Sequence, residues 1–205
     1  MTNNLLQACW DGDLTRVREL IAQKGPECVN WPTDNSKTTP LFYAVKSDSR
    51  NAAGVARILL GSGADVNYVS DVDERGLSPL LAALVEDGCQ DIEVVRLLVA
   101  HGADVNYHGK DQGYTPLHYA CLNGANEIVA LLLDYGADVN EAADLGFTPL
   151  MCACSSGRAD EALVAMLIER GAAVDQVANI EWPPRRSPPS TTCASSRPRP
   201  RPTST

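Results

Sequence analysis

Residues 115–140 read TPLHYACLNGANEIVALLLDYGADVN, and this stretch predicts two short helices joined by a tight turn. Thr before Pro favours a helix start, because the hydroxyl accepts a free backbone N–H and Pro at the first helical position sacrifices no hydrogen bond. After Pro116, small or apolar residues fall at helical spacing as far as Asn123. The second helix is expected to begin at Glu127 and to end at Gly136, because glycine suits a left-handed cap.

The same pattern recurs along the chain. A Thr/Ser-Pro-Leu tripeptide occurs four times, with its prolines at positions 40, 79, 116 and 149. A Gly-Ala-led pentapeptide with Val in fourth place follows each tripeptide, with its glycines at positions 63, 102, 136 and 171. The distances from proline to glycine are therefore 23, 23, 20 and 22 residues. Two signatures that stay in phase four times indicate a repeat protein.

The repeated unit resembles the ankyrin repeat, whose Thr-Pro-Leu-His-x-Ala signature residues 115–120 match in full. Phe42, Leu81 and Met151 replace the histidine in the other three units, so the side-chain network of that histidine is expected in the fourth unit only. Residues 3–35 keep the two-helix rhythm without the Thr-Pro start, as an N-terminal capping unit does. The resemblance implies an all-α fold, an α-solenoid of stacked helix-turn-helix units with projecting β-hairpin-like turns.

The expected organisation is one ankyrin repeat domain over residues 1–180 and a tail over residues 181–205. The five units are placed at about 3–35, 36–73, 74–111, 112–144 and 145–178. At the free end of the fifth unit we expect three exposed apolar residues, Leu163, Met166 and Leu167. Either Ile180 and Trp182 cover that end or the natural array continues, because a solenoid normally ends in a polar cap.

The tail holds seven of the 13 prolines and five arginines, with Glu181 as its one acid, so it is expected to be disordered. A solvated tail is one interpretation. The alternatives are a Pro-rich docking motif, a basic nuclear or phosphate-binding patch, and the product of a shifted reading frame or retained intron.

The charge of the chain divides between these two parts. Of the net charge of −9, residues 1–180 contribute 12 basic and 25 acidic residues, or −13, and the tail contributes +4. An acidic array is a poor match for nucleic acid, although the tail is not excluded by this argument. No run of 18 apolar residues and no leader peptide is apparent, so we expect a protein of the cytoplasm, with the nucleus as an additional compartment. The seven cysteines are scattered and odd in number, which fits reduced, buried thiols.

The sequence favours neither catalysis nor metal binding. His101, His108 and His118 have no cysteine or carboxylate at ligand spacing, and Cys152 and Cys154 would point about 200° apart on a helix. Nucleotide-binding, hydrolase and kinase signatures are absent from the sequence. We therefore predict no enzyme, no cofactor and no metal.

The family resemblance implies that first helices and projecting turns form a concave protein-binding surface. Aromatic residues on a rigid scaffold are favoured as interface anchors. The candidate partner-binding residues are Asp71, Asp73, Glu74, Arg75, Tyr107, His108, Lys110, Asp111, Tyr114, Tyr119, Leu122, Asn123, Glu141 and Asp144. Six acids against two bases predict a partner with a basic patch, unless these acids only keep the array soluble. Tyr114 and Phe147 have a second interpretation, which is packing beside their own signatures.

The resemblance also implies that three asparagines are candidates for hydroxylation, each with a leucine eight residues upstream: Asn67, Asn106 and Asn140. Stabilisation of the turn explains the same residues without any modification. Taken together, the sequence predicts a monomeric adaptor or scaffold that binds another protein and no membrane. The alternatives are a regulatory or inhibitory subunit that occludes an enzyme or transcription factor and, third, an unrecognised enzyme.

Overall fold

The computed structural model describes residues 3–32, 38–47, 49–70, 75–85, 91–110, 112–158, 160–176 and 178. Residues 181–205, where the sequence predicts disorder, lie outside this part of the chain. The helices are α1 (Asn3–Asp11), α2 (Leu14–Lys24), η1 (Pro26–Asn30), α3 (Pro40–Lys46), α4 (Ala52–Gly61), α5 (Pro79–Val85), α6 (Ile92–Ala100), α7 (Pro116–Asn123), α8 (Asn126–Asp134), α9 (Pro149–Ser156) and α10 (Glu161–Glu169). Among the described residues none of these helices is long and apolar enough to span a membrane.

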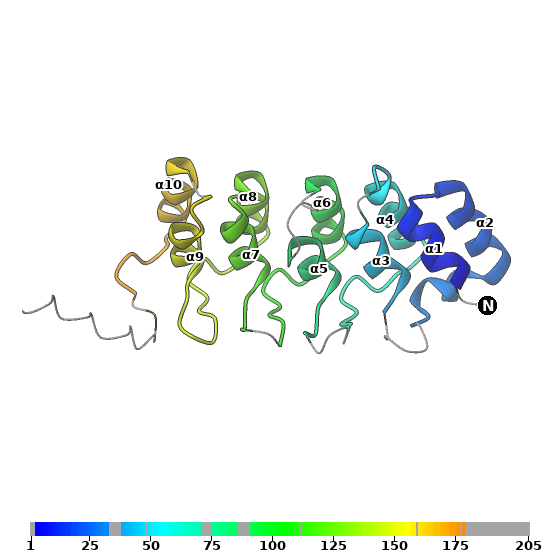
Figure 1. Cartoon of the computed structure of the whole chain (residues 1–205), viewed down its shortest axis with the longest axis horizontal. Coiled ribbons are helices and arrows are strands. Elements are labelled where there is room, and N and C mark those ends of the chain that lie inside the picture. The colour runs from blue at the N-terminus through cyan, green and yellow to red at the C-terminus, as the bar shows by residue number, and fades with distance from the viewer. Residues whose placement is uncertain are drawn as a thin grey trace, which may run out of the picture.

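Five helix pairs stand side by side in a row, and the loops that join successive pairs project from one side (Figure 1). First helices pack on first helices along the series α1, α3, α5, α7 and α9. Second helices do the same along α2, α4, α6, α8 and α10. In one projecting loop Ser70 and Leu77 exchange two backbone hydrogen bonds of 2.9 Å, as in a β-hairpin. The predicted all-α solenoid is confirmed.

Local chemistry sets the helix ends. The hydroxyl oxygens of Thr39 and Thr148 each accept a backbone N–H three residues later, at 3.4 and 3.3 Å, and Pro follows directly. Gly124 closes α7 in the left-handed conformation, with φ at 68°. A side chain there would also lie 2.7 Å from the Arg158 carbonyl oxygen of the next unit, so glycine serves both the turn and the close approach.

One apolar core runs through all units. Four leucines that stand four residues before each capping glycine are fully buried: Leu59, Leu98, Leu132 and Leu167. Leu163 is also fully buried and Met166 is half-buried, so the expectation that the end of the array exposes Leu163 and Leu167 is wrong. The cause is the rotation of α10, which turns these two leucines toward its neighbours α8 and α9.

A ladder of asparagine side chains links each unit to the next. The Asn106 amide donates to the Gly136 carbonyl at 3.1 Å and accepts the Asp138 backbone N–H at 2.9 Å. Its own backbone N–H donates to the Asp104 carboxylate at 2.9 Å, which fixes the turn. Equivalent pairs of inter-unit bonds are made by Asn30, Asn67 and Asn140. We call these four residues the asparagine ladder.

His118 makes a second link, between the fourth and fifth units. Its Nδ1 accepts the Thr115 backbone N–H at 3.2 Å, and its Nε2 lies 2.9 Å from the Phe147 carbonyl oxygen. Because a carbonyl can only accept, Nε2 must carry the proton. Burial lowers the pKa of His118, and its hydrogen bonds to backbone carbonyls oppose part of that shift. Protonation of Nδ1 would place its proton against the Thr115 N–H.

This arrangement predicts a pH-dependent stability. The unfolded histidine has a pKa near 6.5 and the folded one lies below it, so the unfolded state binds more protons between the two values. The contribution is complete above about pH 6.5 and is lost as the pH falls below it. We expect urea unfolding at pH 7.5 and 5.5 to give a lower free energy of unfolding at pH 5.5. In His118→Gln this decrease should shrink, whereas an equal decrease in that variant would assign the effect to other groups.

Candidate protein-binding interface

The first helices present two positions of the repeat on one face of the array. Three residues after each Thr/Ser-Pro proline stand Tyr43, Ala82, Tyr119 and Cys152. Six residues after it stand Lys46, Val85, Leu122 and Ser155, and the matching residues of α1 are Gln7 and Trp10. We call these ten residues the first-helix row. Their side chains vary between units, whereas the leucines behind them repeat, which is what a modular recognition surface requires.

An open groove of about 380 Å³ lies at the N-terminal end of this row, between α1 and α3. Leu6, Gln7, Trp10 and Tyr43 line it, and we call it the Trp10–Tyr43 groove. The Trp10 ring meets Tyr43 edge to face at 6.3 Å and stays 45% exposed. The Ser47 hydroxyl donates to the Trp10 carbonyl oxygen, so the backbone that carries the indole is held against the second unit. An anchored aromatic with an open face is a common interface anchor.

The Trp10–Tyr43 groove was not predicted from the sequence. Trp10 follows Cys9 as Leu122 follows Cys121, and that correspondence could have found it. The first unit lacks the Thr-Pro start, so its register was not read from the signature.

A second aromatic cluster surrounds the start of α7. Tyr114 stacks on His118 at 5.3 Å and meets Tyr119 edge to face at 5.6 Å. Burial raises the pKa of the Tyr114 hydroxyl, and the neighbouring Cys152 thiol adds to the shift. Tyr114 thus packs beside its own signature, and Tyr114, Tyr119 and Leu122 are all half-buried. Asn123 donates to the Leu84 carbonyl at 3.0 Å, which ties this end of α7 to α5.

The thiols near this cluster are poor nucleophiles. Burial raises the pKa of Cys152 to about 11, although the Tyr114 hydroxyl partly opposes the shift. Burial also raises the pKa of Cys121 well above its ordinary value. Because the thiolate is the reactive form, both residues act as small apolar side chains.

Neighbouring projecting turns are bonded to one another. The Lys110 N–H donates to the Arg75 carbonyl at 2.8 Å, and the Asp144 N–H donates to the Gln112 carbonyl at 3.1 Å. The Tyr107 hydroxyl donates to the Gly76 carbonyl at 2.9 Å, and its ring stacks on His108 at 6.3 Å. The Tyr107 hydroxyl therefore spends its donor within the array.

The predicted charged residues are only partly placed by the structure. Arg75, His108, Lys110 and Asp144 are exposed on the turns, and Glu141 is half-buried. The other predicted acids, Asp71, Asp73, Glu74 and Asp111, lie outside the described residues. The acidic excess of the turns thus remains a prediction.

The three candidate hydroxylation sites are members of the asparagine ladder. Asn67 and Asn106 are exposed and Asn140 is half-buried, with each amide bonded to the next unit. These bonds account for the residues as turn and inter-unit stabilisers, and hydroxylation stays a prediction.

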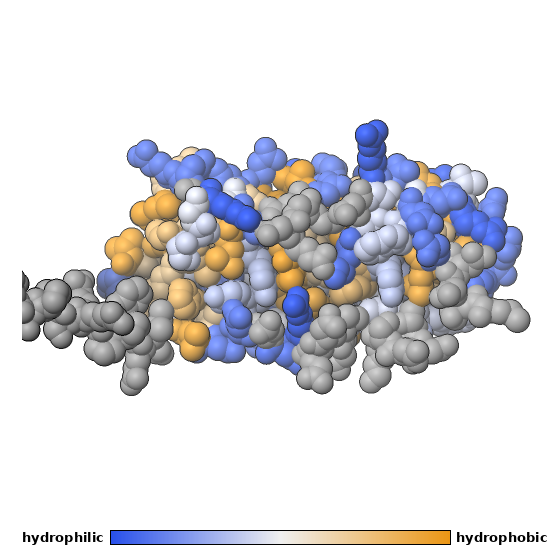
Figure 2. All heavy atoms as spheres, in the orientation of Figure 1, coloured by the Kyte–Doolittle hydropathy of each residue, from blue (hydrophilic) through white to orange (hydrophobic). Residues whose placement is uncertain are grey.

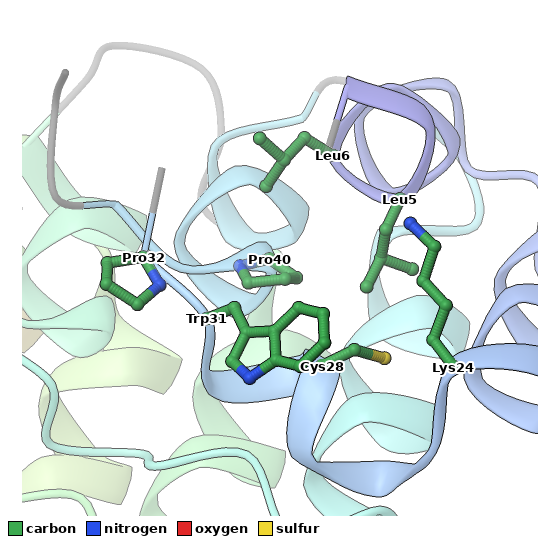
Figure 3. Close-up of a pocket in the computed structure, with 7 residues that line it drawn as sticks. All are labelled: Leu5, Leu6, Lys24, Cys28, Trp31, Pro32 and Pro40. Atoms are coloured by element: carbon green, nitrogen blue, oxygen red, sulfur yellow. The ribbon is translucent and has the colours of Figure 1, made fainter. Parts of the chain in front are cut away.

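A crevice beside α1 is too small for a ligand. Leu5 and Leu6 converge on Trp31 and Pro40 there, with the Lys24 side chain at the edge (Figure 3). Its volume of about 20 Å³ holds one water molecule at most. Within the described ranges no group of three or more histidine, cysteine or acidic side chains could hold a metal ion.

Comparison with known proteins agrees with this geometry. A family description of ankyrin repeats in three copies matches residues 55–143 and 108–178, and a single ankyrin repeat matches residues 36–71. Protein phosphatase 1 regulatory subunit 27 of Mus musculus is 45% identical over 65 residues, which are 31% of this chain and 42% of that protein. The E3 ubiquitin-protein ligase XBAT33 of Arabidopsis thaliana is 56% identical over 43 residues, which are 21% of this chain and 8% of that protein.

The chain thus spans less than half the length of these relatives. The family matches, in contrast, extend from residue 36 to residue 178 and cover more than half of the 205 residues. They coincide with the helix pairs α3/α4 to α9/α10 and with the ladder that joins them. The chain belongs to the ankyrin repeat family.

Proposed function

We propose that this protein is a non-catalytic adaptor or scaffold that binds another protein through its first-helix row. The observation that supports this most directly is the Trp10–Tyr43 groove, where a large aromatic surface is open to solvent although its backbone is anchored. Rigid, exposed aromatics bury much area at a low cost in conformational entropy. Ankyrin repeats imply protein–protein interaction, and the row supplies the contact residues.

The central part of the row extends the same surface. Tyr119 and Leu122 of α7 are half-buried, whereas the intervening Ala82 of α5 is small and buried. The row therefore offers two apolar contact areas with a shallower stretch between them. A partner that reaches both areas needs a surface or segment about as long as three units.

The partner is proposed to carry a basic patch. Residues 1–180 carry a net charge of −13, and Glu141 and Asp144 lie on the projecting turn between α8 and α9. Charges at the rim of an interface mainly speed association and make it salt-dependent. The proposal includes a monomer that acts in the cytoplasm or nucleus. The five described cysteines are unpaired, which suits a reducing compartment.

A regulatory subunit is the second candidate function. It is favoured by one observation, the 45% identity over 65 residues to a protein named as a phosphatase regulatory subunit. An adaptor leaves the activity of its bound partner unchanged, whereas an occluding subunit inhibits it in a stoichiometric complex. An activity assay of the purified complex therefore separates the two.

Substitution of the aromatic groove tests the proposal. A partner is identified by affinity purification with the full chain, and its Kd is then measured with purified proteins. We expect Trp10→Ala to weaken binding about 10- to 30-fold, because truncation of an interface anchor costs about 1–2 kcal/mol or more. Leu122→Ala is expected to weaken binding to a smaller extent.

Trp31→Ala is the matched control, because Trp31 is 50% exposed and lies off the first-helix row. It should bind with the wild-type Kd. Equal Kd values for Trp10→Ala and wild type, with circular dichroism showing both folded, would remove the groove from the interface.

A further inference from the structure

The free end of the fifth unit exposes apolar positions that the second, third and fourth units cover or half-cover. Two repeat positions show this, namely three residues before and three residues after the capping glycine. At the first, Leu60 and Val99 are buried and Leu133 is half-buried, but Ile168 is 47% exposed. At the second, Val66 and Val105 are buried and Val139 is half-buried, but Val174 is 72% exposed. Figure 2 shows hydrophobic residues gathered at this end, over α9 and α10.

The same end lacks the chemistry that would accept another ankyrin unit through the asparagine ladder. Asp175 stands where Asn67, Asn106 and Asn140 stand in earlier units. A carboxylate cannot donate the hydrogen bond that each ladder amide gives to the next glycine carbonyl. Ala173 also replaces the aspartate whose carboxylate accepts the ladder residue's N–H in earlier units. This end therefore suits an occupant that brings both apolar side chains and hydrogen-bond donors.

The charge around this end is negative. Glu161, Glu169 and Asp175 are exposed there. Arg170, the nearest base in sequence to Asp175, is already bonded to Asp134 of the fourth unit at 2.9 Å. An arginine in the occupant would therefore find carboxylates that can accept its guanidinium hydrogen bonds.

We propose that the segment from Ile180 to Arg186 of the same chain covers this end of the array. Its sequence is Ile-Glu-Trp-Pro-Pro-Arg-Arg, and Ile180 and Trp182 are the only large apolar residues after Ala178. Ile180 and Trp182 lie against Ile168 and Val174, and Arg185 or Arg186 bonds Asp175. The segment replaces the polar cap that a solenoid normally carries.

Chain length supports this occupant. Ala178 is the last described residue and follows Val174 by four positions. An extended chain spans at most about 3.6 Å per residue, so Ile180 lies within about 7 Å of Ala178 and Trp182 within about 14 Å. The exposed face is thus within reach of both apolar side chains. Nothing further along the tail is needed for the contact.

Amide hydrogen exchange on the full chain tests the proposal. In Trp182→Ser we expect amides of residues 161–172 to exchange about tenfold faster or more, because the substitution removes the aromatic ring proposed to cover this face. Val174→Ser should accelerate the same amides, and the double variant should exchange no faster than the faster single variant. Amides of residues 126–137 serve as the internal reference, and Trp31→Ser serves as the control for loss of an exposed tryptophan elsewhere.

Unchanged exchange of residues 161–172 in Trp182→Ser would overturn the proposal, and so would strictly additive effects of the two substitutions. A concentration-dependent dimer in sedimentation equilibrium that Val174→Ser abolishes would instead assign the face to a second copy and overturn it as well. Combined Arg185→Ser and Arg186→Ser should accelerate exchange in the wild-type background but not in Asp175→Asn. The same acceleration in both backgrounds would overturn the arginine contact. These outcomes are independent of whether the first-helix row binds a partner.

Discussion

The hydrogen bonds from one asparagine side chain to the backbone of the next unit set the geometry of the whole array. Each ladder residue donates to a glycine carbonyl and accepts the N–H two residues beyond that glycine. The two bonds fix both the distance and the rotation between neighbouring units. A pair of neutral hydrogen bonds contributes about 1–3 kcal/mol to the stability of the array. Apolar burial drives the stacking, and the ladder selects one register for it.

The fixed register between units aligns the side chains of the first-helix row. Because successive units are held in the same orientation, residues three and six positions after each proline form one continuous row. Trp10 and Tyr43 then meet across a unit boundary at 6.3 Å, and His118 lies 2.9 Å from the Phe147 carbonyl oxygen across another. A slipped register would separate these pairs. Partner recognition on the row therefore depends on turns that a partner need not touch.

Local signals made most of the fold predictable. The expected helices from Pro116 to Asn123 and from Glu127 onward agree with α7 and α8 within a residue, because capping and proline chemistry act over a few residues only. The sequence also identified His118 as the one histidine at the signature position, where its ring can bond the backbone of its own and the next unit. The inter-unit half of the ladder was not predictable, since it depends on where the neighbouring glycine carbonyl lies.

The misses have a common physical cause. Periodicity predicts that α10 has an apolar face but not which neighbour that face meets, so Leu163 and Leu167 were assigned to the wrong side. The Trp10–Tyr43 groove arises between two helices of different units, and one of those units lacks the signature that sets the register. In both cases the decisive contact joins residues that are far apart in the sequence. Tyr114 was predictable in part because its ring packs on its own signature.

The most direct test of the role of the asparagine ladder is the free energy of unfolding of Asn106→Ala, measured by urea denaturation at pH 7.5. The substitution leaves the Gly136 carbonyl and the Asp138 N–H without their inter-unit partner. We therefore expect the free energy of unfolding to fall by about 1–3 kcal/mol. Asn106→Asp keeps the acceptor but sets a carboxylate oxygen against the Gly136 carbonyl oxygen, so it should also be less stable than wild type. A free energy of unfolding for Asn106→Ala within about 0.5 kcal/mol of wild type would contradict the claim that the ladder holds the units in register.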